Sequence, residues 1–222
     1  MKDSIRLPLH LLAGLVLLLL SATCFHAIAG AALGPGARLA VLDVAVAHWL
    51  HARASEPLTS LVLGFSHIHS MAGIGFLSLL LAWHFWRRQA HYWMLTLVLA
   101  VPPGMLLNVL LKHSYQRARP SFAEPLLTLP TYSFPSGHAL AATVFYGVLA
   151  CYLWTRCRSA AQRIGVACGA LLMVALVAFS RLYLGVHFLT DVMAGVAEGL
   201  GWLAVCVTAV SSLRRHREGR LA

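Results

Sequence analysis

Charged residues are scarce in this chain of 222 residues. They make up 11% of the sequence, whereas hydrophobic residues make up 59%. Soluble globular chains average about 25% charged residues, because water must solvate their surfaces. The composition therefore excludes a soluble enzyme, an intrinsically disordered chain and a nucleic-acid binder, and it indicates an integral membrane protein.

Acidic residues and paired cysteines are also few. The chain has seven Asp and Glu residues, and no two of those expected on its outer side lie close in sequence. Hard cations need several carboxylate oxygens, so we expect neither a metal nor any other cofactor. The five cysteines form no C-x-x-C pair, and no disulfide framework is implied.

Long apolar runs dominate what is present. A helix needs about 20 mostly apolar residues to cross a hydrocarbon core, and six segments meet this requirement. We therefore expect an all-α, polytopic membrane protein with a single domain over residues 1–222. The predicted transmembrane helices are Leu7–Ala29, Leu58–Phe85, Tyr92–Leu111, His138–Trp154, Ile164–Tyr183 and Phe188–Val210.

The first apolar segment has features of a secretory signal peptide, including Lys2, Arg6 and the small-residue pattern Ala27-Ile-Ala29. Its apolar stretch is longer than the usual signal-peptide core of about 7–15 residues, so we expect a retained helix. Between the first two spans, apolar residues at helical spacing predict an interfacial helix that ends near Trp49. Two prolines argue against a helix in Ser121–Phe134.

Basic residues are divided unequally between the two sides of the membrane. A cytoplasmic N-terminus places eleven Lys and Arg residues inside and six outside, as the positive-inside rule requires. Both termini are then cytoplasmic. The sole asparagine, Asn108, lies in a span, so the chain has no N-glycosylation site, which favours a bacterial inner membrane. The cations on the outer, periplasmic side are not needed for orientation and are functional candidates.

Three clusters of polar residues fall at the predicted outer ends of helices. Because successive spans alternate in direction, we expect all three clusters at the same membrane face. They are Lys112-x6-Arg119-Pro120, Pro135-Ser136-Gly137-His138 and Ser180-Arg181-x5-His187-x3-Asp191.

The cations and one helix start suit a phosphate group. Lys112, Arg119 and Arg181 can neutralise a dianion, the arginines as planar forks and the lysine as a point charge. Ser136 stands where a helix N-cap is expected, and the backbone amides that follow it can face an anion. Gly137 has no Cβ and lets the backbone approach closely.

Two histidines suit nucleophilic and acid–base chemistry. His187 and Asp191 are four residues apart and therefore share one helix face. A hydrogen bond to Asp191 would fix the tautomer of His187 and make its other ring nitrogen more nucleophilic. His138 would then be available to protonate a leaving oxygen.

These motifs resemble the signature of the type-2 phosphatidic acid phosphatase (PAP2) superfamily, with every position and spacing retained from 112 to 191. The resemblance implies a six-helix bundle that dephosphorylates lipid phosphates or diphosphates through a phosphohistidine on His187. Asp191 would assist, and His138 would act first as acid and then as base. The phosphoryl group would be held by Lys112, Arg119, Ser136, Gly137 and Arg181, without a metal.

Several interpretations stay open. The resemblance and the outward-facing site favour undecaprenyl diphosphate as substrate, with phosphatidylglycerophosphate and lipid A phosphates as alternatives. A lipid phosphotransferase would use the same residues, and the oligomeric state is undetermined. An anion transporter is the non-enzyme alternative, because Pro102-Pro103-Gly104 is expected to break the third span. Glu198 is expected to have a packing role, and Gly195 and Gly199 to admit a close helix neighbour.

Overall fold

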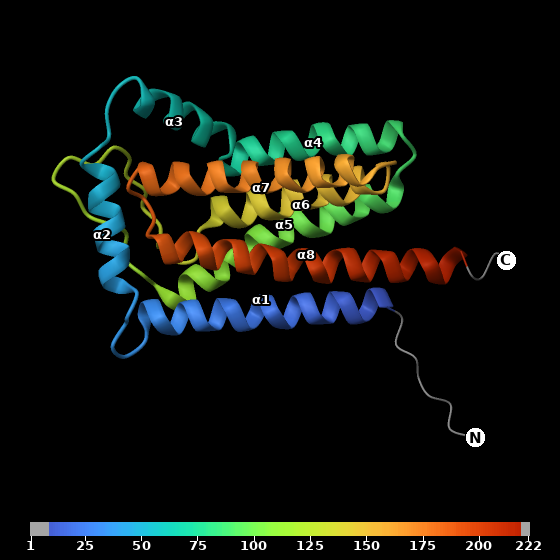
Figure 1. The fold of residues 1–222 in the computed structure, drawn as a ribbon, viewed down its shortest axis with the longest axis horizontal. Helices are drawn as coiled ribbons and strands as arrows, with labels where there is room; N and C mark the ends of the chain where they lie inside the picture. The colour runs from blue at the N-terminus through green and yellow to red at the C-terminus, as the bar shows by residue number, and fades with distance from the viewer. Residues whose placement is uncertain (1–8, 219–222) are drawn as a thin grey trace.

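A computed structural model describes residues 9–218, which form eight α-helices and no strand (Figure 1). Five helices are long and apolar enough to cross a membrane, and α3 and α4 together make a sixth candidate span. The prediction of an all-α, polytopic membrane protein is therefore confirmed. The helices are α1 (Leu9–Leu33), α2 (Ala40–His51), α3 (Leu58–Ile68), α4 (Met71–Arg87), α5 (His91–Tyr115), α6 (Gly137–Trp154), α7 (Ala160–Tyr183) and α8 (Leu189–Glu218).

The second predicted span is not one helix. It is divided into α3 and α4, which meet at an angle of 54°. The His69 Nδ1 atom lies 2.9 Å from the carbonyl oxygen of Phe65 at the end of α3, and Ser70 has extended backbone angles. The Ser70 hydroxyl then accepts the backbone N–H of Gly73 and caps α4. The polar stretch from Ser66 to Ser70 interrupts the apolar run at this point, and its last residue is a type favoured as a helix N-cap, a signal that the prediction of one span did not use.

The expected break in the third span is also wrong. Helix α5 continues through Pro102 and Pro103. A proline at position 103 removes the N–H that would bond the carbonyl of Leu99. The indole Nε1 of Trp202, on α8, donates to that carbonyl and to the next one, at 3.1 Å each. A neighbouring helix thus supplies the donor that proline lacks, and α5 stays helical.

Helix α6 lies at the centre of the bundle and packs against α5, α7 and α8. A Cβ atom at Gly195 would lie 2.4 Å from the carbonyl oxygen of Ser136, and one at Gly199 would lie 2.8 Å from Cβ of Thr143. These contacts confirm the predicted close approach of a helix at the two glycines. The close packing of α6 and α8 places the start of α6 beside the first turns of α8.

One end of the bundle carries the irregular segments. Helix α2, which corresponds to the predicted interfacial helix, lies across this end, and residues 116–136 form a loop beside it (Figure 1). The start of α1 and the end of α8 lie at the opposite end (Figure 1). Lys2, Arg6 and Arg220, which contributed to the orientation argument, lie outside the described residues.

Candidate active site

The three polar motifs meet at the end of the bundle covered by α2. Lys112 lies in the last turn of α5, Ser136 stands at the N-cap position of α6 without a side-chain capping bond, and His187 lies in the short connection from α7 to α8. A cavity of about 250 Å³ opens there. Five of the eight predicted site residues line it, namely Lys112, Arg119, Gly137, His138 and His187. The other three, Ser136, Arg181 and Asp191, are buried and do not line it.

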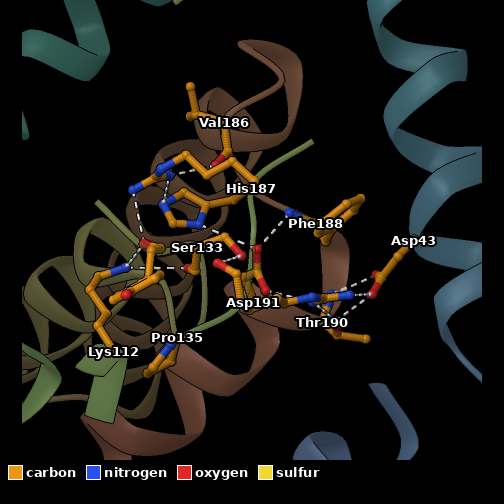
Figure 2. Close-up of polar contacts among 12 residues, drawn as sticks. Asp43, Lys112, Ser133, Pro135, Val186, His187, Phe188, Thr190 and Asp191 are labelled. Carbon is orange, nitrogen blue, oxygen red and sulfur yellow. Dashed lines mark hydrogen bonds and ion pairs between the residues drawn. The ribbon is translucent and has the colours of Figure 1, made fainter. Parts of the chain in front are cut away.

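His187 and Asp191 form the predicted pair. The Nδ1 atom of His187 lies 3.4 Å from Oδ2 of Asp191, a separation longer than the usual hydrogen bond of about 2.9–3.0 Å. Catalytic contacts often shorten only when substrate binds. The Nδ1 atom has no hydrogen-bond partner within residues 9–218, and a proton placed on it would face the carboxylate and leave the lone pair on Nε2. Figure 2 shows the ring of His187 between Val186 and Asp191.

The surroundings of His187 keep its imidazole neutral. Its pKa lies well below the ordinary value, first because the ring is buried and then because Arg119, Lys112 and Arg181 are close. A nearby positive charge makes a second positive charge on the ring unfavourable. A neutral imidazole has the lone pair that a nucleophile needs.

Two of the three predicted cations are fixed by loop carbonyls. The guanidinium of Arg119 donates to the carbonyls of Val186 at 2.6 Å and Thr131 at 2.7 Å, and its Nη1 lies 3.3 Å from Nε2 of His187. The Nζ atom of Lys112 donates to the carbonyl of Tyr132 at 2.8 Å (Figure 2). Both positive charges are held in position beside the ring, which reduces the reorganisation needed when an anion binds.

Ser136 and Arg181 have polar atoms that are unpaired in the described part of the chain, although neither residue lines the cavity. Arg181 is 2% exposed and donates through Nη1 to the hydroxyl of Ser66. Its Nε and Nη2 atoms and the Oγ atom of Ser136 have no hydrogen-bond partner within residues 9–218. Buried polar groups are nearly always paired, so these atoms are available to a further hydrogen-bonding group.

The start of α6 depends on a polar contact inside the bundle. A Cβ atom at Gly137 would lie 2.9 Å from Oδ1 of Asn108, so only glycine fits there without a shift of that side chain. The Nδ2 atom of Asn108 donates to Oε2 of Glu198 at 2.8 Å. Glu198 is thus hydrogen-bonded through Oε2, whereas its Oε1 atom has no partner within residues 9–218, and the packing role expected from the sequence stays a prediction.

Sequence reasoning did not assign a role to three residues at the site. The guanidinium of Arg117 donates to Asp191, to Asp43 and to the hydroxyl of Thr190, and that hydroxyl donates to Asp43. Figure 2 shows Asp43, Thr190 and Asp191. Arg117 was among the outer cations not needed for orientation, which was the only signal for it. Asp43 had no signal, because it lies on α2 and is far in sequence from the other two.

The fold and the site together define a class of protein: a polytopic helical membrane protein with a buried His–Asp pair beside fixed cations. A model of the PAP2 superfamily matches residues 91–215. The matched region contains all three motifs and covers more than half of the chain. The chain therefore belongs to the PAP2 superfamily.

One curated protein is similar to this chain in sequence, and two crystal structures are similar to it in fold. The chain is 38% identical over 109 residues to phosphatidylglycerophosphatase B of Bacillus subtilis, an alignment that spans 48% of this chain and 52% of that relative. A crystal structure of a transmembrane PAP2-type phosphatidylglycerolphosphate phosphatase from Bacillus subtilis aligns with a TM-score of 0.74 at 28% identity, covering 87% of this chain and 94% of that one. The crystal structure of Aquifex aeolicus LpxE aligns with a TM-score of 0.60 at 21% identity, covering 75% of this chain and 94% of that one, a likeness of fold alone.

Proposed function

We propose that this protein is a lipid phosphatase that removes a phosphate group from a lipid phosphate or diphosphate through a phosphohistidine on His187. The observation that carries the proposal is the arrangement of His187. Its Nδ1 atom faces Asp191, and the ring lines a cavity that Lys112 and Arg119 also line. A neutral nucleophile beside fixed cations suits attack on a phosphate dianion.

The reaction has two displacements. Nε2 of His187 attacks phosphorus, the bond from phosphorus to the leaving oxygen breaks, and His138 donates a proton to that oxygen. Water then attacks the phosphohistidine, His138 accepts the proton of the water, and inorganic phosphate leaves. Asp191 stabilises the positive ring while the phosphoryl group is attached. The cations neutralise the phosphoryl oxygens in both transition states, so no metal is required.

Two lipid substrates have separate support. The names of the Bacillus subtilis relatives support phosphatidylglycerophosphate. The proposed orientation, with both termini cytoplasmic and the site at the periplasmic face of a bacterial inner membrane, supports undecaprenyl diphosphate, which is released on that face. The apolar side chains of Met105, Val109 and Leu129 line the cavity beside the polar groups and suit either lipid tail.

Phosphate release by the purified protein in detergent tests this proposal. We expect release from a panel of lipid phosphates in the presence of a chelator, and none from the His187→Ala variant. The relative rates on phosphatidylglycerophosphate, undecaprenyl diphosphate and a lipid A phosphate rank the substrates. Equal activity of His187→Ala, or complete loss with the chelator that added metal restores, would refute the mechanism. Formation of a new lipid phosphate from an added lipid alcohol, without release of inorganic phosphate, would instead identify a phosphotransferase.

A further inference from the structure

A cluster of ion pairs connects α2, which lies across one end of the bundle, to Asp191, the carboxylate that faces His187. The guanidinium of Arg117 lies between two carboxylates: its Nη1 donates to Oδ1 of Asp191 at 2.6 Å, and its Nη2 donates to Oδ2 of Asp43 at 2.8 Å. Asp43 belongs to α2 and is 1% exposed, whereas Asp191 is fully buried. Figure 2 shows Asp43 on its separate helix, facing Thr190 and Asp191.

Asp43 also holds the first turn of α8. Its Oδ1 atom accepts the backbone N–H of Thr190 at 3.0 Å, and its Oδ2 atom accepts the Thr190 hydroxyl at 2.5 Å. Free N–H groups at a helix start need acceptors, and here the acceptor comes from another helix. Since Asp191 follows Thr190 directly, the position of Asp43 constrains the carboxylate that faces His187.

The cluster also has a defined charge. Two carboxylates and one guanidinium give the cluster itself one net negative charge, which partly offsets the positive charges of Arg119, Lys112 and Arg181 near the imidazole of His187. Without Asp43, Arg117 would neutralise Asp191, and the ring would face no net negative charge when it became positive. Charge interactions are strong at such buried positions, because little water is present to screen them.

We propose that Asp43 is a positioning residue for the phosphatase reaction: through Arg117 and Thr190 it orients Asp191 and keeps a net negative charge beside His187 while the phosphohistidine forms. This inference rests on the proposed function. Asp43 does not line the cavity, so its effect is expected on the rate of the chemical step and not on the binding of the phosphate group.

The Asp43→Asn variant removes the charge and retains the size of the side chain. We expect kcat to fall about tenfold or more, since members of one buried ionic network are energetically coupled. KM for the lipid phosphate and the inhibition constant of inorganic phosphate should stay within about two-fold, because binding is untouched. Glu56→Gln is the matched control: it removes an exposed carboxylate that, among residues 9–218, accepts hydrogen bonds from Ser60 in its own segment, and it should leave kcat unchanged.

A second variant separates charge from structural support. Asp43→Asn combined with Arg117→Gln restores one net negative charge at Asp191, so this double variant should be at least as active as Asp43→Asn alone. If the two residues only hold helices together, the double variant should instead be less active than either single variant, and the inference would be wrong. Thr190→Val, which removes one hydroxyl and no charge, covers the case in which Asp43→Asn does not fold, and should lower kcat with KM unchanged.

The same assays distinguish the two proposals. If the wild-type protein releases phosphate and His187→Ala does not, the proposed function stands. Wild-type kcat in both Asp43→Asn and Thr190→Val would then overturn the role of Asp43 alone. If the wild-type protein releases no phosphate from any lipid in the panel, the proposed function fails, and the role of Asp43 fails with it.

Discussion

Each end of the bundle contains an ion pair between an arginine and a carboxylate, and the two pairs differ in their exposure to solvent. At the end covered by α2, Arg117 is 10% exposed and its partner Asp191 is fully buried. At the opposite end, Arg214 pairs with Glu218 within α8, and both side chains are more than half exposed. Water and salt screen the second pair and leave the first almost unscreened. Burial therefore separates the charges of this chain that interact almost unscreened from those that water and salt screen.

Removal of a buried cation from the site end should have the largest effect on activity. Arg181→Ala should lower kcat by about 10²–10³-fold, the usual cost of losing one donor to the transition-state oxygens. Arg181 is buried, and two of its nitrogen atoms have no partner within residues 9–218, which leaves them for the phosphoryl group. Steady-state kinetics on a lipid phosphate measure this change.

Arg53→Ala is the matched control for Arg181. Arg53 lies near the same end of the bundle, but its side chain is exposed and bonds the carbonyl of Trp49. Its removal should leave kcat within about two-fold. Equal losses in the two variants would show that position at this end, and not burial, decides the effect.

The pH dependence of Arg119→Gln tests whether the buried charge of Arg119 controls the protonation of His187. Burial and the charge of Arg119 keep the pKa of His187 well below the ordinary value. Removal of the charge should raise that pKa, so that more of the ring is protonated and inactive as the pH falls. The acid limb of kcat/KM should therefore move to higher pH, and at about pH 5 the variant should lose about tenfold more activity than at about pH 8.

The charge-conserving variant Arg119→Lys provides the reference for this shift. A lysine retains the positive charge beside the ring, so its acid limb should match that of the wild type even where its rate is lower. Identical acid limbs in the Gln and Lys variants would mean that the charge of Arg119 does not control the protonation of His187.

Glu198 should contribute to stability and not to chemistry. Glu198→Gln keeps an oxygen that accepts the Asn108 amide and should retain activity within about two-fold. Glu198→Leu leaves the amide of Asn108 without that partner and should lower the free energy of unfolding by about 1–3 kcal/mol. Thermal unfolding in detergent compares the two variants, and an inactive Glu198→Gln of normal stability would indicate a catalytic role.

The smallest effect is expected at the opposite end of the bundle. Arg214→Ala breaks the exposed pair with Glu218, which is worth about 0.3–0.5 kcal/mol in a helix. Activity and unfolding temperature should remain within experimental error of the wild type. A loss of activity as large as that expected for Arg181→Ala would show that an exposed charge matters as much as a buried one, which would contradict the comparison.

Most of the fold was predictable from the sequence because apolar length alone identifies membrane spans. The exceptions concern local backbone chemistry. The break between α3 and α4 depends on the cap formed by Ser70, and the continuity of α5 depends on Trp202 from another helix. A linear pattern contains neither contact, so the sequence predicted one straight span and one broken span where the structure has the reverse.

The site was predictable only where its residues form compact motifs. His187 and Asp191 are four residues apart, and this short separation keeps them close, although His187 lies just before α8 and the two do not share the predicted helix face. Asp43 and Arg117 are separated from each other and from Asp191 by long stretches of chain, and only the packing of α2 over the bundle end brings them together. From the sequence alone, an aspartate that stands by itself in an apolar helix cannot be distinguished from one that is exposed to solvent.

The covalent intermediate tests the central claim most directly. In the His138→Ala variant, a nitrophenyl phosphate needs no acid to leave, whereas hydrolysis of the phosphoenzyme lacks its base. The account predicts that mass spectrometry of the quenched protein finds phosphate on the peptide that contains His187, and that this signal is absent when His187 is also replaced. Nitrophenol release without a phosphorylated peptide, or phosphate on a different residue, would contradict it.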